Sequence, residues 1–506
     1  MDLNSRFEID NTTWNDLSLE DVYSRLNYCD TSAGEYFLRD RLKRPYIKKC
    51  EEYDSFINLT DEAAIFRNNK SLKDALLYIS KLKKYNFVDE IMSIKDEEQG
   101  NNLKHIIIDA FIIISFIMIF IFPGPGIVAF FGFIAYSVSD YFKTKNIIAG
   151  HLTVFNYLIR MLKSLRKYRV CEITDITEYN NKLKQLKEII NIYKPFIRGT
   201  YIISESAKTT SNPLSILFDY IRMIFHVDII KYNSMISFVI NNREDAIKFY
   251  NIIGELDTAI CISSIKDDLL CKKLKLCKPD ISNNKHFELV DGYHLLLDSP
   301  VINSINTDKN ILITGCNASG KSTFLKMIAV NIIFAQSFGF VFASTYKACF
   351  FRIYSSMALK DDINKGESYF IAEIKSLKRI VDACSTSDNS IPVFCVIDEV
   401  LRGTNTVERI AASTEILLNL KTDNSLCFAA THDIELTELL KESYDNYHFS
   451  EKISGDDVEF DFKIKEGPAN SRNAIRLLKA LGYDEKIVLN ASKRVDSFLE
   501  SGEYTV

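Results

Sequence analysis

The chain has 506 residues, of which 47% are hydrophobic and 25% charged, with only 18 Gly and 9 Pro. This composition excludes a disordered or collagen-like polymer, and a prior of roughly 100 to 200 residues per domain predicts about three folded units. The formal net charge of −5 excludes an overall attraction to nucleic acid or to an anionic membrane, so any site for a polyanion must be local.

The N-terminal segment, MDLNSRFEIDNTTW, has no basic region followed by an apolar run, so we expect no cleaved secretory signal. The 11 cysteines are scattered and contain no CxxC pair, which favours a reducing cytoplasm over a disulfide framework or a zinc site. Apolar stripes at helical spacing mark 180–193 and 244–276. We therefore expect an α-helical core and lever domain in two parts, 1–105 and 143–284.

Between these two parts lies an apolar segment, 106–142. Its arms, 106–122 and 127–142, have 17 and 16 residues, just short of the roughly 18 to 20 residues of a membrane helix. The uncharged tetrapeptide Pro-Gly-Pro-Gly at 123–126 separates them and predicts a tight turn. Lys104 precedes the first arm and Lys143 follows the second, whereas the turn between the arms carries no charge. This distribution of positive charge fits a membrane hairpin with both ends at the inner face of the cell membrane. A helical hairpin buried in the core domain is the alternative.

After about residue 285 short apolar runs alternate with helical segments, which predicts a parallel sheet with covering helices. The run 311–314 leads directly into the sequence GCNASGKS at 315–322, a complete G-x-x-x-x-G-K-S phosphate loop. In such a loop backbone N–H groups surround the phosphates, Lys321 supplies a positive charge, and the Ser322 hydroxyl ligates Mg²⁺.

Two further runs, 393–397 and 426–430, end in polar residues that suit the same site. Asp398 would hold Mg²⁺ through water, and Glu399 would polarise the water that attacks ATP. His432 would bond the terminal phosphate or that water. Acid pairs and single histidines at strand ends are often structural, but beside a phosphate loop they predict a hydrolytic site.

Taken together, these segments resemble the ATPase domain of the MutS family of mismatch-repair proteins. The matching stretches are Gly315–Leu325, Asp398–Thr406, Ala430–His432 with Glu435-Leu436, Asp361-Asp362, Gly366–Phe370 with Glu373, Gly467–Ala474 and Gly482, and more weakly Thr31–Gly34 and Gly254–Asp257. Cys316 and Ala318 depart from the family, which usually has Pro and Met there.

The resemblance implies an α/β ABC-type P-loop ATPase domain at 285–506, ending in dimerisation helices and preceded by the helical domain with its apolar hairpin. It implies a homodimer that uses ATP and Mg²⁺. The catalytic residues would be Glu399, His432 and Lys321, and the metal ligands Ser322 and Asp398. Nucleotide contacts would come from Gly315, Asn317, Ser319, Gly320, Lys321, Ser322 and Thr323, and, across the dimer, from Ser368.

The core-like segment begins within the first thirty-odd residues, so we expect a short, membrane-associated branch of the family without mismatch-reading and connector domains. Two functions stay open. The first is an ATP-gated clamp on double-stranded DNA, supported by a basic stretch that is more often a solvated face: Lys143, Lys145, Arg160, Lys163, Arg166, Lys167 and Arg169. The second is a membrane-bound, ATP-driven switch or scaffold for protein partners that binds no DNA.

Overall fold

The computed structural model describes residues 5–82, 87–94, 102–170, 177–197, 213–316, 319–357, 369–385, 391–402, 404–454, 457–469, 475, 478 and 482–501. The chain divides into two compact units. The α/β unit comprises 1–27, 39–57 and 264–506, and the helical unit comprises 28–38 and 58–263. Helices α3 (Ser32–Lys43), α4 (Glu51–Phe66) and α14 (Arg243–Cys271) have residues in both units.

The helical unit confirms the helices that apolar spacing predicted. Besides parts of α3, α4 and α14 it contains α5 (Lys70–Ser80), α6 (Phe87–Ser93), α7 (Asn102–Ile121), α8 (Pro123–Lys167), α9 (Thr177–Ile192), α10 (Lys194–Ile197), α12 (Pro213–Ile224) and α13 (Val227–Asn241). Aromatic pairs fill its interior: Phe66 stacks on Tyr179 with ring centroids 4.5 Å apart, and Phe87 on Tyr250 at 4.9 Å. Such offset ring pairs stabilise a core beyond the area they bury.

Within the helical unit, the start of α3 meets the middle of α14. Asp257 is buried and accepts hydrogen bonds from the Thr31 N–H at 2.8 Å and the Thr31 hydroxyl at 2.6 Å. Burial raises the pKa of Asp257 to about 6. A Cβ on Gly34 would lie 2.3 Å from the Asp257 carboxylate, and one on Gly254 would lie 2.6 Å from the Ala33 carbonyl oxygen. The close approach of the two helices therefore requires both glycines.

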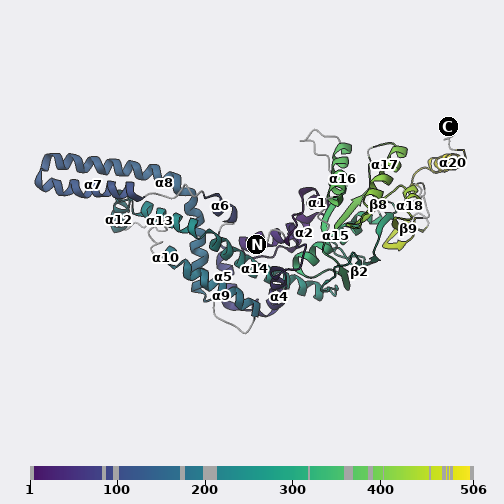
Figure 1. Ribbon diagram of the computed structural model, residues 1–506, viewed down its shortest axis with the longest axis horizontal. Coiled ribbons are helices and arrows are strands. Elements are labelled where there is room, and N and C mark those ends of the chain that lie inside the picture. The colour runs from purple at the N-terminus through teal and green to yellow at the C-terminus, as the bar shows by residue number, and fades with distance from the viewer. Residues whose placement is uncertain are drawn as a thin grey trace. The chain divides into compact units, whose positions relative to one another are not determined.

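Helices α7 and α8 form the apolar hairpin and run side by side (Figure 1). The predicted Pro-Gly-Pro-Gly turn is wrong: Pro123 is the first residue of α8, which continues for 45 residues, and only Phe122 separates the two helices. Proline suits the first turn of a helix because its missing N–H would have no helical partner there. Gly126 allows the close contact, since a Cβ there would lie 2.6 Å from the Ile119 nitrogen.

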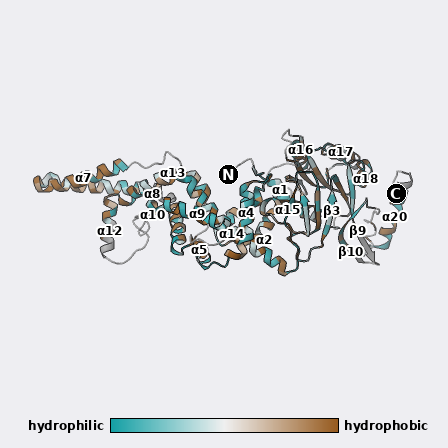
Figure 2. Ribbon diagram, turned by 60° about the horizontal axis from the view of Figure 1, so that its bottom comes forward, coloured by the Kyte–Doolittle hydropathy of each residue, from teal (hydrophilic) through white to brown (hydrophobic). Residues whose placement is uncertain are grey.

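The hairpin is rich in apolar residues (Figure 2), and many of them are exposed. Its two segments that are long and apolar enough to cross a membrane, 102–121 and 123–145, are each only 22% buried. Its exposed large side chains are Ile106, Ile107, Phe111, Ile113, Ile114, Phe116, Ile117, Phe120, Ile121, Phe122, Ile127, Val128, Phe131, Tyr136 and Phe142. In the part of the chain that the structure describes, the hairpin is therefore not a buried core element.

The α/β unit is built on two sheets. The larger has the order β10 (Asp457–Glu466), β9 (Tyr444–Ser454), β4 (Asn310–Thr314), β8 (Ser425–Thr431), β7 (Val393–Asp398), β6 (Arg352–Ser356), and every pair in it is parallel except β10 with β9. The smaller has the order β1 (Asp280–Ile281), β5 (Thr345–Ala348), β2 (Phe287–Gly292), β3 (Asn303–Thr307). The three predicted apolar strands are confirmed as β4, β7 and β8.

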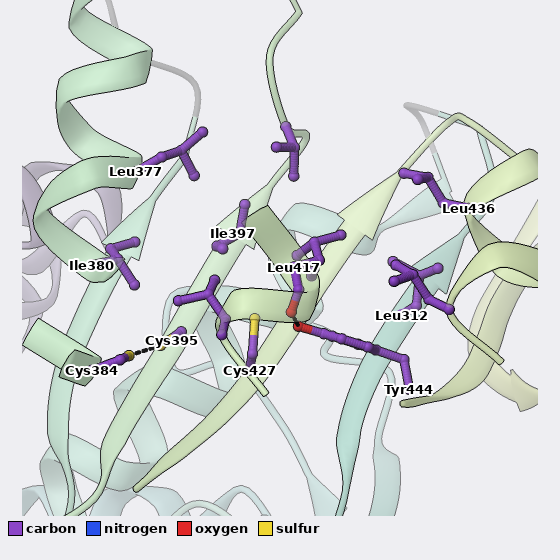
Figure 3. Close-up of a cluster of buried hydrophobic side chains, with 14 of the residues drawn as sticks. Leu312, Leu377, Ile380, Cys384, Cys395, Ile397, Leu417, Cys427, Leu436 and Tyr444 are labelled. Atoms are coloured by element: carbon purple, nitrogen blue, oxygen red, sulfur yellow. Dashed lines mark hydrogen bonds between the residues drawn. The ribbon is translucent and has the colours of Figure 1, made fainter. Parts of the chain in front are cut away.

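Helices α1 (Asn11–Asp16), α2 (Leu19–Leu26), α15 (Lys321–Phe338), α16 (Tyr369–Ser385), α17 (Thr406–Asn419), α18 (Glu435–Leu439) and α20 (Glu485–Ser501) complete this unit. Leucines of α16 and α17 meet Ile397 and Cys427 of the central strands in one apolar cluster (Figure 3). Every residue of β4, β7 and β8 is buried. The interior positions of these strands are accordingly all apolar, and polar residues stand only at strand ends.

Candidate functional site

The carboxyl ends of β4, β8 and β7 meet at one edge of the larger sheet. Thr314 pairs with Thr431, and Asp398 pairs with Ala430. Because the three strands are parallel, the phosphate-loop sequence after β4, His432 after β8 and Glu399 after β7 lie at the same edge. The structure thus brings together the residues for which the sequence predicted catalytic and metal-binding roles.

The loop between β4 and α15 depends on two glycines. Gly315 and Gly320 have φ angles of 137° and 101°, values that other residues rarely adopt. A Cβ on Gly315 would also lie 2.7 Å from the backbone oxygen of Phe449. Ser319 is buried, and its hydroxyl donates to the Cys316 carbonyl at 2.7 Å, which closes the loop. Asn317 lies outside the described residues.

Lys321 begins α15 with its ammonium inside this loop. The side chain is buried, and Nζ donates to the carbonyl oxygens of Gly315 at 2.6 Å and Cys316 at 2.9 Å. Burial lowers the pKa of Lys321, and the negative charges of Asp398 and Glu399 oppose that effect in part. A polyphosphate entering the loop would replace the two carbonyls as partners of this ammonium.

Ser322 and Asp398 provide oxygen ligands for a cation. The Ser322 hydroxyl donates to Asp398 Oδ2 at 2.5 Å, and Asp398 is buried at the end of β7. A hydroxyl and a carboxylate are the hard oxygen donors that Mg²⁺ takes beside substrate phosphates, so the pair fits this ion. Thr323, the next residue of α15, has an exposed side chain.

Glu399 lies between two basic groups. Its Oε1 is 2.6 Å from His432 Nε2, and its Oε2 forms an ion pair with the Arg402 guanidinium. Burial alone would raise the pKa of Glu399, but His432, Arg402 and Lys321 outweigh burial and lower it. The carboxylate is therefore ionised at neutral pH. An ionised carboxylate beside an imidazole and an ammonium can orient a water molecule and accept its proton.

Four residues support this arrangement without having been given a role from the sequence. Glu373, buried on α16, accepts the Arg402 backbone N–H at 3.1 Å. Arg409 on α17 pairs with Asp433 through two hydrogen bonds of 2.8 and 2.6 Å. Since Arg402 pairs with Glu399 and Asp433 follows His432, these contacts fix the segments that carry both catalytic candidates. Glu373 and Arg402 lie in the segments that resemble the MutS family. This resemblance was the feature of the sequence that could have identified them.

Phe462 is a further residue beside the loop. In the sequence, Val458, Phe460, Phe462 and Ile464 alternate with polar residues, which is typical of a half-buried strand, and this segment forms β10. A register shift follows Phe460, however, and Phe462 has a φ of 51° with 43% of its surface exposed. A Cβ on Gly320 would lie 3.2 Å from the Phe462 ring. An exposed aromatic ring at this place can stack on a nucleotide base.

Several predicted residues fall outside the described residues, so the structure does not place them. They are Asn317, Ser368 with the adjacent Gly366-Glu367 and Asp361-Asp362, Gly403, and the segment 470–474.

Residues 311–499 match the family model of MutS domain V. DNA mismatch repair proteins MutS align with the chain at 29% identity in Orientia tsutsugamushi (46% of this chain, 27% of the relative), 27% in Ruminiclostridium cellulolyticum (50% and 29%) and 30% in Fusobacterium nucleatum (50% and 29%). The chain spans less than a third of the length of these curated relatives.

Proposed function

The chain belongs to the MutS family, and from this premise we propose that it binds and hydrolyses ATP with Mg²⁺ at the edge of its larger sheet. The observation that carries the proposal is the meeting of Lys321, the Ser322–Asp398 pair and the Glu399–His432 pair at three adjacent strand ends. Phosphate binding, cation binding and water activation are thus available within one site.

Each group has a separate task in this proposal. Lys321 and the loop N–H groups hold the phosphates, Ser322 and Asp398 hold Mg²⁺, and Glu399 orients the attacking water and accepts its proton, with His432 beside it. When bound, Mg²⁺ would neutralise part of the negative charge that develops on the phosphate oxygens. This set of roles supports an ABC-type P-loop ATPase domain.

Nucleotide binding is tested by thermal unfolding of the purified chain with and without Mg-ATP. A ligand that binds the folded state at 100 times its Kd stabilises it by about 2.7 kcal/mol. We expect this shift to disappear in Lys321→Ala and to persist in Lys441→Ala, which removes an exposed lysine paired with Glu438. An unchanged shift in Lys321→Ala would exclude this loop as the binding site.

We further propose that the active species is a homodimer in which Ser368 of one subunit completes the site of the other. The family resemblance of the segment around Ser368 supports this arrangement. Subunits with Ser368→Ala mixed with subunits carrying Lys321→Ala should regain one intact site per heterodimer. Heterodimers that form but show no more activity than either variant alone would exclude the shared site.

Double-stranded DNA is the proposed partner of this dimer, held as in an ATP-gated clamp. The supporting observation is a row of exposed basic side chains at helical spacing on α8, formed by Arg160, Lys163 and Lys167. Each phosphate contact contributes a slope of about −0.9 to a plot of log affinity against log salt. We expect a steep slope that changes with ATP and falls when the three residues become Gln. Binding without salt dependence, or no binding, would oppose the clamp.

The exposed hairpin favours a second function, that of a membrane-bound ATP-driven switch for protein partners. Its apolar faces would lie in the hydrocarbon layer, with Lys104, Lys143 and Lys145 at the inner face of the cell membrane. Carbonate extraction of membranes from expressing cells tests this placement. We expect the chain to stay in the pellet and a variant lacking 106–142 to be released. Release of both proteins would refute insertion.

A further inference from the structure

Three buried side chains of the helical unit point ligand atoms at one another. His105 lies in α7, Asp140 in α8, and His226 immediately before α13. Their exposed fractions are 5%, 8% and 0%. One ligand atom from each residue lies within 4.8 Å of the other two. The cluster lies where the first apolar arm begins and the second ends. It connects this end of the hairpin to α13.

The three atoms have unused hydrogen-bonding capacity. His105 Nδ1, Asp140 Oδ2 and His226 Nε2 are buried and have no hydrogen-bond partner among the described residues. His105 Nδ1 is 3.3 Å and His226 Nε2 is 3.7 Å from Asp140 Oδ2. Burying polar atoms without partners is unfavourable, so their convergence on one point requires an explanation.

The surrounding contacts direct a lone pair of His226 toward Asp140. His226 Nδ1 lies 3.0 Å from Asp109 Oδ1, where an N–H on Nδ1 would donate to the carboxylate. In that tautomer Nε2 carries a lone pair that faces the oxygen of Asp140. Lys104 pairs with the other oxygen of Asp140, Oδ1. The lone pair of His226 Nε2, the Nδ1 atom of His105 and a carboxylate oxygen of Asp140 therefore converge.

From this arrangement we propose that His105, Asp140 and His226 bind a divalent transition-metal ion of the Zn²⁺ class. Bonds of about 2.0–2.1 Å in a tetrahedral site place neighbouring ligand atoms about 3.4 Å apart, close to the two distances observed. Two imidazoles and one carboxylate suit Zn²⁺, Fe²⁺ or Co²⁺ and not the all-oxygen preference of Mg²⁺ or Ca²⁺. Asp109 orients the ligating His226, as a carboxylate behind a metal-bound imidazole commonly does.

The site is held in place before any ion binds. The Tyr141 hydroxyl donates to Asp228 of α13 at 2.7 Å, and the Ser137 hydroxyl donates to the Ile224 carbonyl at the end of α12 at 2.6 Å. Both contacts anchor α8 next to Asp140. A bound ion would therefore fasten α7, α8 and α13 together at the base of the hairpin.

The test uses the full chain in detergent, freed of metal by chelator and titrated with Co²⁺ in excess Mg²⁺. We expect one Co²⁺ per chain with the visible absorption of a tetrahedral site, displaced by Zn²⁺ and not by Ca²⁺. His105→Ala and His226→Ala should lose stoichiometric binding. His286→Ala, which removes a partly exposed histidine of the α/β unit, should bind as the wild type does.

A second variant separates metal binding from folding. Asp109→Asn keeps all three ligands and should bind Co²⁺ about 10 to 100-fold more weakly at unchanged stoichiometry. Far-UV circular dichroism and the thermal shift with Mg-ATP verify that each variant is folded. The absence of stoichiometric Co²⁺ and Zn²⁺ binding by the wild type would overturn the proposal and leave a proton-sharing histidine–carboxylate cluster. Equal binding by the folded alanine variants would also overturn it.

Discussion

Replacing Glu399 with Gln separates ATP binding from hydrolysis at the proposed site. The amide keeps the size of the side chain, and its oxygen can still accept from either His432 or Arg402, the two groups that contact the carboxylate. It cannot accept a proton from water. Loss of a positioned general base lowers the rate by about 10²-fold or more. That change corresponds to about 2.7 kcal/mol or more in activation free energy.

Binding should survive the same change, because removing a negative charge beside Lys321 does not weaken an electrostatic site for phosphates. Single-turnover hydrolysis measures the chemical step, and the thermal shift with Mg-ATP measures binding. Glu438→Gln is a matched control, since Glu438 is exposed on α18 and pairs only with Lys441 among the described side chains. A single-turnover rate within a few-fold of wild type would remove Glu399 from the role of base.

Three further outcomes follow from particular contacts. Gly315→Ala should lower the thermal stability of the α/β unit by about 1–3 kcal/mol and abolish the shift with Mg-ATP, because its Cβ meets the Phe449 carbonyl at 2.7 Å and its φ is 137°. Asp257 has a folded-state pKa of about 6, above the ordinary value of about 3.9. Its contribution to stability is therefore complete below about pH 4 and lost as pH rises through about 6. The melting temperature of the helical unit should fall more steeply over this range in wild type than in Asp257→Asn, which retains an acceptor for Thr31. Phe462→Ala should raise KM for ATP about tenfold with little change in kcat, given about 1–3 kcal/mol per stacked base, as steady-state kinetics would show.

The strands and the sheet edge of the proposed site were predictable because short, contiguous sequence patterns indicate them. Fully buried strands are continuous apolar runs, and the phosphate loop is a contiguous motif with Gly315, Lys321 and Ser322 at set spacings. The placement of β8 between β4 and β7 was not predictable from these runs, because strand order depends on pairings between distant segments. That order is what brings His432 next to Glu399.

Other features depend on contacts that a local pattern does not contain. The Pro-Gly-Pro-Gly sequence has the composition of a turn, but packing of Gly126 on Ile119 allows the helix to begin at Pro123. His105 and His226 are 121 residues apart in sequence (226 − 105), and nothing in the neighbourhood of either one indicates the other. The contact of Glu373 with the Arg402 N–H likewise appears only when α16 packs beside β7.

Phosphate release from ATP by the purified full chain, with and without Mg²⁺, tests the central claim most directly. The arrangement of Lys321, Ser322 and Asp398 predicts release that requires Mg²⁺ and is lost in Lys321→Ala, while Lys441→Ala keeps the wild-type rate. Release that continues in Lys321→Ala, or no release from ATP by the wild-type chain with Mg²⁺ present, would contradict the assignment of this sheet edge as an ATPase site.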